Sequence, residues 1–233
     1  WGINNYRRIF EHLTTFTDFE FEYSLQTNIT LLTAEYLELF KRYNCRLSTS
    51  IDGLKEHHNA NRLLRNNEGS FDLVKEKLEL AKSMDVHIGA VVVVSKTNIN
   101  SLIDIYEFFK SVGCGFRLNP LALIGEAKNI NSQGVTSEEY AQQLIKLFDY
   151  WIKDENAVGI TNFIEIASNI QTGMTYQCSL SPNCQGSLTT IEPNGDVTPC
   201  DRFTGNKDFV YGNILTEDLE PLMRKKLEDF HRR

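Results

Sequence analysis

Along the first half of the chain, the spacing of apolar residues changes back and forth between that of a strand and that of a helix. This pattern predicts strands that alternate with helices. Every second residue from Phe19 to Leu25 is apolar, which is the period of a strand. From Tyr36 to Phe40, apolar residues recur at helical spacing instead. The same two periods predict further strands at residues 45–51, 86–94 and 115–121, and further helices at 71–84 and 99–112.

Four consecutive strand–helix steps indicate an α/β protein with a parallel sheet. The segment 86–94 is almost wholly apolar, which is typical of a strand buried on both faces of such a sheet. Thr33 and Ser70 precede two of the helices and are suitable N-caps. Because four parallel strands are too few to close a barrel, we expect either an open sheet or a barrel whose other strands precede Trp1.

The second half of the chain predicts two more helices. Thr136 and Glu139 have the spacing of a capping box, which predicts a long helix that continues through Trp151. A second helix is expected at 160–170.

The composition changes near residue 172, where turn residues and cysteines become frequent. The Asn194-Gly195 pair predicts a β-hairpin over 189–198, and an amphipathic pattern predicts a last helix at 215–230. We therefore expect two domains, 1–172 and 173–233.

Polar residues follow the predicted strands at the point where each strand ends. Ser50 and Asp52 end the second strand, Gln26-Thr27-Asn28 ends the first, and Asn119-Pro120-Leu121 ends the fourth. Since parallel α/β sheets bind ligands at the carboxyl ends of their strands, this edge is the expected site. Arg62 could pair there with a carboxylate through two nitrogens. Taken alone, Asp52 before Gly53 also fits an ordinary turn.

The balance of charged residues argues against some classes of binding partner. Asp and Glu outnumber Lys and Arg by 31 to 24, which gives a formal net charge of −7 and argues against binding to nucleic acid or to an anionic membrane. No apolar run is long enough to span a bilayer, so we expect a cytoplasmic protein. The chain opens on Trp1 rather than on methionine, so we also expect a piece of a longer protein.

Three of the five cysteines, Cys178, Cys184 and Cys200, lie in the last quarter of the chain. Thiolates at this spacing can hold an iron–sulfur cluster, with a fourth ligand from elsewhere. The alternatives are reduced cysteines without a metal, or a zinc site. Asp201 could act as a general base beside such a centre, or it could simply stabilise a turn. His57 and His58 are adjacent, which favours a solvated loop over a shared metal.

Taken together, these segments resemble one family, the radical S-adenosylmethionine (SAM) enzymes with a SPASM-type auxiliary-cluster domain. The nearest branch is that of the anaerobic sulfatase maturases and peptide maturases, and the resemblance runs from about Tyr6 to the end. It is carried by Gln26-Thr27-Asn28, Ser50-Ile51-Asp52-Gly53, His58 with Arg62, Gly69-Ser70-Phe71, Asn119-Pro120-Leu121, Cys178, Cys184, and the block from Ile191 to Asp201 followed by Gly212-Asn213-Ile214.

The resemblance implies a fold and a set of ligands. The fold would be a partial parallel (β/α) barrel, with the four strands as its third to sixth, followed by a small Cys-rich region that contains the hairpin. The SAM site would be formed by Ser50, Asp52, Arg62 and Leu121. An auxiliary [4Fe-4S] cluster would be held by Cys178, Cys184 and Cys200, with Asp201 as the catalytic proton acceptor. The CxxxCxxC loop of the radical cluster would precede Trp1, residues 173–233 would be the first half of the auxiliary-cluster domain, and its second half would follow Arg233.

The resemblance also implies an enzyme that removes hydrogen from a residue of a peptide or protein substrate during post-translational maturation, by crosslinking, thioether formation or formylglycine formation. It would need SAM, [4Fe-4S] clusters and an electron donor such as flavodoxin or ferredoxin. The alternative is a non-catalytic module that binds peptides or carries an iron–sulfur cluster without the radical cluster.

Overall fold

A computed structural model describes residues 2–123, 127, 129–130, 133–175 and 188–232. The chain divides into two compact units, Trp1–Ile164 and Glu165–Arg233. Among the described residues, no helix is both long and apolar enough to cross a membrane.

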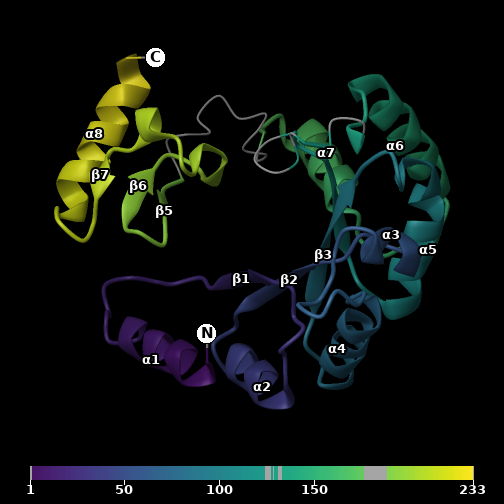
Figure 1. The fold of residues 1–233 in the computed structure, drawn as a ribbon, viewed down its shortest axis with the longest axis horizontal. Coiled ribbons are helices and arrows are strands. Elements are labelled where there is room, and N and C mark those ends of the chain that lie inside the picture. Colours follow the sequence, from purple (N-terminus) through teal and green to yellow (C-terminus); the bar gives the residue numbers. More distant parts are fainter. Residues whose placement is uncertain (1, 124–126, 128, 131–132, 176–187, 233) are drawn as a thin grey trace. The chain divides into compact units, whose positions relative to one another are not determined.

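The first unit is an α/β fold around a four-stranded sheet (Figure 1). The strands are all parallel and lie in the order β1-β2-β3-β4, which confirms the predicted parallel sheet. The strands are β1 (Ser24–Thr27), β2 (Arg46–Ser50), β3 (Ile88–Val94) and β4 (Phe116–Pro120). The helices are α1 (Ile3–Leu13), α2 (Ala34–Arg42), α3 (Lys55–Asn59), α4 (Phe71–Ser83), α5 (Leu102–Val112) and α6 (Ser137–Trp151), and α7 (Thr161–Thr172) begins in this unit.

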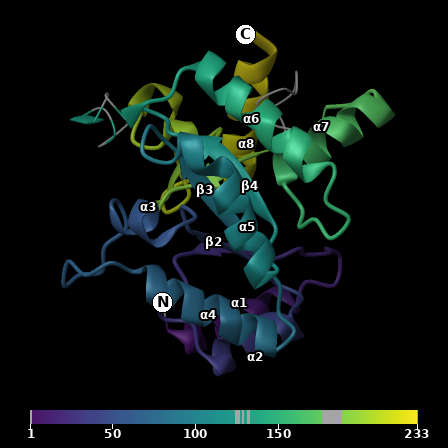
Figure 2. The same cartoon turned by 90° about the vertical axis from the view of Figure 1, so that its right-hand side faces the viewer.

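The two faces of the sheet differ in burial. In β3, Ile88, Ala90, Val92 and Val94 are buried, whereas the alternate positions are only half-buried. Helices cover the buried face, and α5 lies in front of β3 and β4 in Figure 2. The prediction that residues 86–94 are buried on both faces is therefore wrong. The apolar run reflects one helix-covered face and one half-open face that β-branched residues also line.

The first predicted strand is displaced. Alternation from Phe19 predicts a strand at 19–25, but the ladder begins only at Ser24, which pairs with Arg46 at the start of β2. Because β2 itself starts at Arg46, none of the described strands pairs with the residues before Tyr23, and Phe19 stays 68% exposed. Alternation alone does not make a strand where a partner is missing.

The predicted helix caps have different outcomes. Thr136 and Glu139 form the predicted capping box at the start of α6. Thr33 and Ser70 occupy the N-cap positions of α2 and α4, but neither side chain makes a capping hydrogen bond. At α4 the Phe71 N–H instead donates to Asn59 Oδ1 at 3.0 Å. The Ser70 hydroxyl therefore has another use, described below.

The second unit contains a small antiparallel sheet of three strands, in the order β5-β6-β7, and a helix. β5 and β6 pair across the turn at Asn194-Gly195, where Gly195 has a φ of +89°. The elements are β5 (Thr190–Ile191), β6 (Asp196–Thr198), β7 (Gly212–Asn213) and α8 (Leu219–Arg232).

Gly53 is a position where only glycine fits. Its φ is +91°, and a β-carbon added there would lie 2.9 Å or less from the fully buried Ile105 side chain. We expect Gly53→Ala to lower the free energy of unfolding by about 3 kcal/mol, because left-handed backbone strain adds to overpacking. Urea-induced unfolding measures this loss.

Gly113→Ala is the matched control for that substitution. Gly113 also has a positive φ, +69°, but an added β-carbon would meet only the flexible end of Lys82, at 3.4 Å. Equal losses for the two variants would show that contact with Ile105 contributes nothing.

Candidate active site

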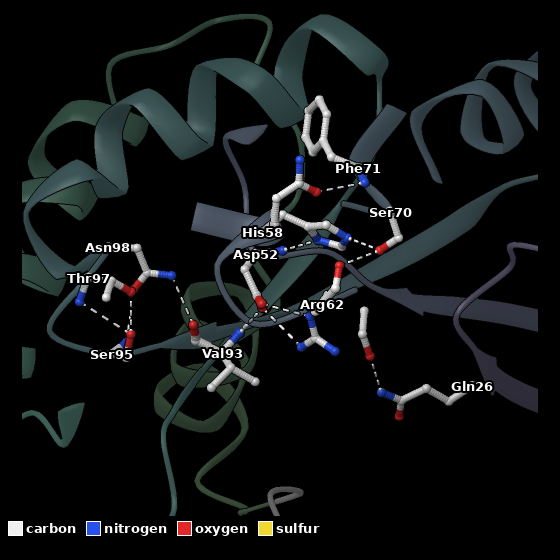
Figure 3. A network of polar contacts seen from close by, with 12 residues as sticks. Gln26, Asp52, His58, Arg62, Ser70, Phe71, Val93, Ser95, Thr97 and Asn98 are labelled. Carbon is white, nitrogen blue, oxygen red and sulfur yellow. Dashed lines mark hydrogen bonds and ion pairs between the residues drawn. The ribbon is translucent and has the colours of Figure 1, made fainter. Parts of the chain in front are cut away.

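Asp52 and Arg62 form an ion pair just beyond the end of β2 (Figure 3). Arg62 Nε lies 2.7 Å from Asp52 Oδ2, and Arg62 Nη2 lies 3.1 Å from Oδ1. Asp52 Oδ1 also accepts from the Val93 N–H at 3.0 Å, which ties the pair to β3. The Asp52 side chain is 5% exposed and that of Arg62 is 30% exposed. The sequence predicted that Arg62 pairs with the carboxylate of a ligand; in the structure, two of its nitrogens pair with Asp52 instead.

His58 is buried next to Asp52. The prediction that it lies in a solvated loop is therefore wrong. The side chain belongs to α3 and is 1% exposed. Its Nδ1 accepts from the Asp52 N–H at 3.3 Å, and its Nε2 lies 2.8 Å from Ser70 Oγ. Burial lowers the pKa of His58 to about 4, and the Arg62 charge adds to this effect while Asp52 opposes it. The imidazole is therefore neutral at pH 7.

The end of β3 is held by Asn98. Its Nδ2 donates to Val93 O at 2.9 Å, and its Oδ1 accepts from the Ser95 N–H at 2.9 Å. Because Asn98 is 2% exposed, this amide satisfies main-chain groups that the end of the strand leaves without ladder partners. The Val93 N–H is thereby fixed where it meets Asp52.

A pocket of about 430 Å³ opens at the carboxyl ends of β2, β3 and β4. Polar groups from two strand ends face apolar side chains across it, a mixture typical of a small-molecule site. Two other hollows have larger volumes but lie away from the strand ends. One, of about 770 Å³, lies on α1, and the other, of about 540 Å³, lies on the outer surfaces of α5 and α6. The strand-end pocket is lined by Asp52, Asn61, Arg62, Val93, Ser95, Asn98, Leu121, Ala127, Ile130 and Gln133.

Three of the four residues predicted to contact a cofactor line this pocket, namely Asp52, Arg62 and Leu121. Ser50 lies on β2 outside its lining, where its Oγ accepts from Gln26 Nε2 at 3.3 Å. Leu121 is held by its N–H, which donates to Val94 O at 2.8 Å. The structure therefore brings Asp52, Arg62 and Leu121 to one site and places Ser50 beside Gln26 of the neighbouring strand.

The chemistry of this pocket fits a nucleoside that carries an amino-acid group, such as SAM. Asp52 accepts one N–H from Nε and one from Nη2 of Arg62, so among the described contacts the two N–H groups of Nη1 and the second N–H of Nη2 remain for a ligand. Arg62 offers donors for a carboxylate or a ribose hydroxyl, while Leu121 and Ile130 offer apolar surface for a base.

Only part of the predicted cluster site is described. Cys178 and Cys184 lie outside the described residues, within which no three His, Cys, Asp or Glu side chains gather as a metal site. Cys200 is half-buried at the end of the β6 segment, and its Sγ lies 3.0 Å from Oδ1 of the exposed Asp201.

The cysteines of the first unit differ from Cys200. Cys45 and Cys114 are buried, and burial raises the pKa of both thiols, that of Cys114 to about 12. Both thiols are enclosed in the core of the first unit, so of the described cysteines only Cys200 is accessible to a cluster.

Sequence reasoning missed much of what supports the pocket. The roles of Val93, Asn98 and the Ser70 hydroxyl had no signal in the hydrophobic pattern, because each depends on a hydrogen bond between a side chain and a main-chain group, which periodicity does not encode. His58 is among the residues that carry the family resemblance. That resemblance was the signal that could have indicated a buried role for His58, although the residues around it in sequence are polar.

Residues 178–232 match the family model of SPASM, described as an iron–sulfur cluster-binding domain. The serine-type anaerobic sulfatase-maturating enzyme of Bacteroides thetaiotaomicron is 32% identical over 222 residues, which cover 87% of this chain and 52% of that enzyme. The cysteine-type anaerobic sulfatase-maturating enzyme of Clostridium novyi is 28% identical over 207 residues, which cover 86% and 55%. The chain thus spans about half the length of the curated relatives it matches.

Solved structures agree with these relatives. Native anSMEcpe with bound AdoMet superposes with a TM-score of 0.84 at 25% identity, over 97% of this chain and 64% of that one. Streptococcus suis SuiB bound to the precursor peptide SuiA superposes with a TM-score of 0.67 at 15% identity, over 92% of this chain and 50% of that one. The second similarity shows the fold alone.

Proposed function

Because this chain belongs to the radical SAM enzymes with a SPASM-type domain, we propose that its protein removes a hydrogen atom from a residue of a peptide or protein during post-translational maturation. The observation that carries the proposal is the strand-end pocket with its Asp52–Arg62 pair, in a fold shared with an AdoMet-bound structure. Formylglycine formation, thioether formation and crosslinking all begin with this step.

The proposal assigns a task to each residue of the pocket. When bound at a reduced [4Fe-4S] cluster, SAM supplies the radical that removes hydrogen from the substrate. Arg62 holds the carboxylate or ribose of SAM through the N–H groups that Asp52 does not use, Asp52 fixes the guanidinium, and Leu121 packs against the adenine. The Ser50 hydroxyl, oriented by Gln26, adds a hydrogen bond from β2.

A second site is proposed in the C-terminal region. Cys178, Cys184 and Cys200 hold an auxiliary [4Fe-4S] cluster, and Oδ1 of Asp201 takes a proton from the substrate once hydrogen has been removed. In this proposal residues 1–172 are the barrel domain, which contains the third to sixth barrel strands, and 173–233 belong to the SPASM-type domain. A flavodoxin or ferredoxin supplies electrons in the cytoplasm.

The proposal is tested by SAM cleavage. Full-length protein, reconstituted anaerobically with iron and sulfide and supplied with dithionite and SAM, is expected to release 5′-deoxyadenosine. Chromatography against a no-enzyme control measures the product. A sample with verified clusters that releases no more 5′-deoxyadenosine than the control would refute the proposal.

A further inference from the structure

One buried hydrogen-bonded loop joins the main chains of Asp52 and Arg62 through His58 and Ser70 (Figure 3). It passes from the Asp52 N–H to His58, from His58 to Ser70 Oγ, and from that hydroxyl to the Arg62 carbonyl at 2.9 Å. The Asp52–Arg62 ion pair closes the loop on the pocket side. The two residues are therefore tied together twice, through their side chains and through their main chains.

The direction of each hydrogen bond in the loop is determined by chemistry. A main-chain N–H can only donate, so the Asp52 N–H requires an unprotonated Nδ1 on His58. The single imidazole proton is then on Nε2 and is donated to Ser70 Oγ, whose own proton goes to the Arg62 carbonyl. The neutral Nε2–H tautomer of His58 therefore satisfies every donor in the loop.

Ordinary packing does not explain this arrangement. An apolar side chain could fill the space against Phe71, whose ring centroid lies 5.9 Å from that of His58. Burial of an imidazole and a hydroxyl is costly unless both are hydrogen-bonded, and here their partners are the two residues that form the ion pair. The imidazole and the hydroxyl thus fix the distance between the Asp52 N–H and the Arg62 carbonyl.

We infer that His58 and Ser70 are positioning residues that hold the main chain of Arg62 at a set distance from Asp52, so that the guanidinium is oriented before SAM binds. The inference rests on the proposed function, because the ligand is the one proposed for the pocket. Neither residue lines the pocket, so each acts through Arg62. Preorganisation of this kind raises affinity by lowering the ordering cost of binding.

The test measures SAM affinity of the full-length protein by anaerobic titration. Ser70→Ala keeps the bond from the Asp52 N–H to His58 and the main-chain bond from the residue 70 N–H to Arg62 O at 3.2 Å, but it removes the hydroxyl that joins His58 to the Arg62 carbonyl. It is expected to weaken binding by about tenfold. His58→Gln keeps an amide nitrogen near the Nε2 position and loses the acceptor for Asp52, so it should weaken binding to a similar extent. Ser83→Ala removes another α4 hydroxyl that donates to a main-chain carbonyl, and it should leave affinity unchanged.

A double-mutant cycle separates positioning from a general loss of structure. If Ser70 acts through Arg62, Ser70→Ala should weaken binding in the wild type but not in an Arg62→Ala background. Equal losses in both backgrounds, or no loss in the wild type, would overturn the inference while leaving the proposed function intact. No SAM binding by the wild type would overturn both. His58→Gln in the same cycle gives a second answer if Ser70→Ala proves unstable.

Discussion

Arg62→Ala is expected to weaken SAM binding by about a hundredfold and to destabilise the first unit by about 3 kcal/mol. The substitution leaves the Asp52 carboxylate, which is 5% exposed, with the Val93 N–H but without its counter-charge. Loss of one partner is more costly than loss of a whole buried pair, because the remaining charge stays desolvated. SAM titration and urea-induced unfolding of the full-length protein measure the two effects.

Two further variants make this prediction specific. Arg62→Lys keeps the charge but loses the two-nitrogen geometry, so its affinity for SAM should fall between those of the wild type and Arg62→Ala. Arg46→Ala removes an arginine from β2 whose partner, Glu22, is as exposed as Arg46 itself, and it should cost less than about 1 kcal/mol. If Arg46→Ala weakened SAM binding as much as Arg62→Ala, the role assigned to the Asp52–Arg62 pair would be wrong.

Asp201→Asn is expected to reduce modified product by at least about a hundredfold while 5′-deoxyadenosine is still released. The amide keeps the size of the side chain but cannot take a proton from the substrate. The exposed carboxylate lies next to Cys200, with Oδ1 3.0 Å from Sγ, so the variant also removes a charge beside a proposed cluster ligand. Iron and sulfide content must therefore be measured on the same sample.

Asp208→Asn is the matched control, because it removes another exposed aspartate from the same unit. It should retain product formation and cluster content. If Asp201 only stabilises the turn after Cys200, cluster content should fall together with both activities. Full product formation by a cluster-loaded Asp201→Asn protein would remove Asp201 from the mechanism.

Local pattern located most elements of the first unit and missed two. α1 was not predicted, although Ile3, Tyr6 and Phe10 share the helical spacing that places Phe10 in the core. The short helix α3 was missed because five residues are too few to show a period. Conversely, the alternation from Phe19 predicted a strand where the described part of the chain provides no neighbouring strand.

The sequence by itself determined the order of strands and helices, the capping box at Thr136, and the edge of the sheet where Asp52 and Leu121 meet. These features follow from periodicity and from covalent order, which are local. Parallel strands with helical connections must place their carboxyl ends along one edge, so strand-end residues were predictable as a group.

Only the tertiary structure decided which atoms those residues contact. The partner of Arg62, the use of the Ser70 hydroxyl and the burial of His58 depend on hydrogen bonds of side chains that form only once the segment between β2 and α4 has folded. Buried polar groups must find partners, and some of these partners lie far apart in sequence. Val93, 41 residues from Asp52, is one such partner, and no local pattern in the chain specifies that contact.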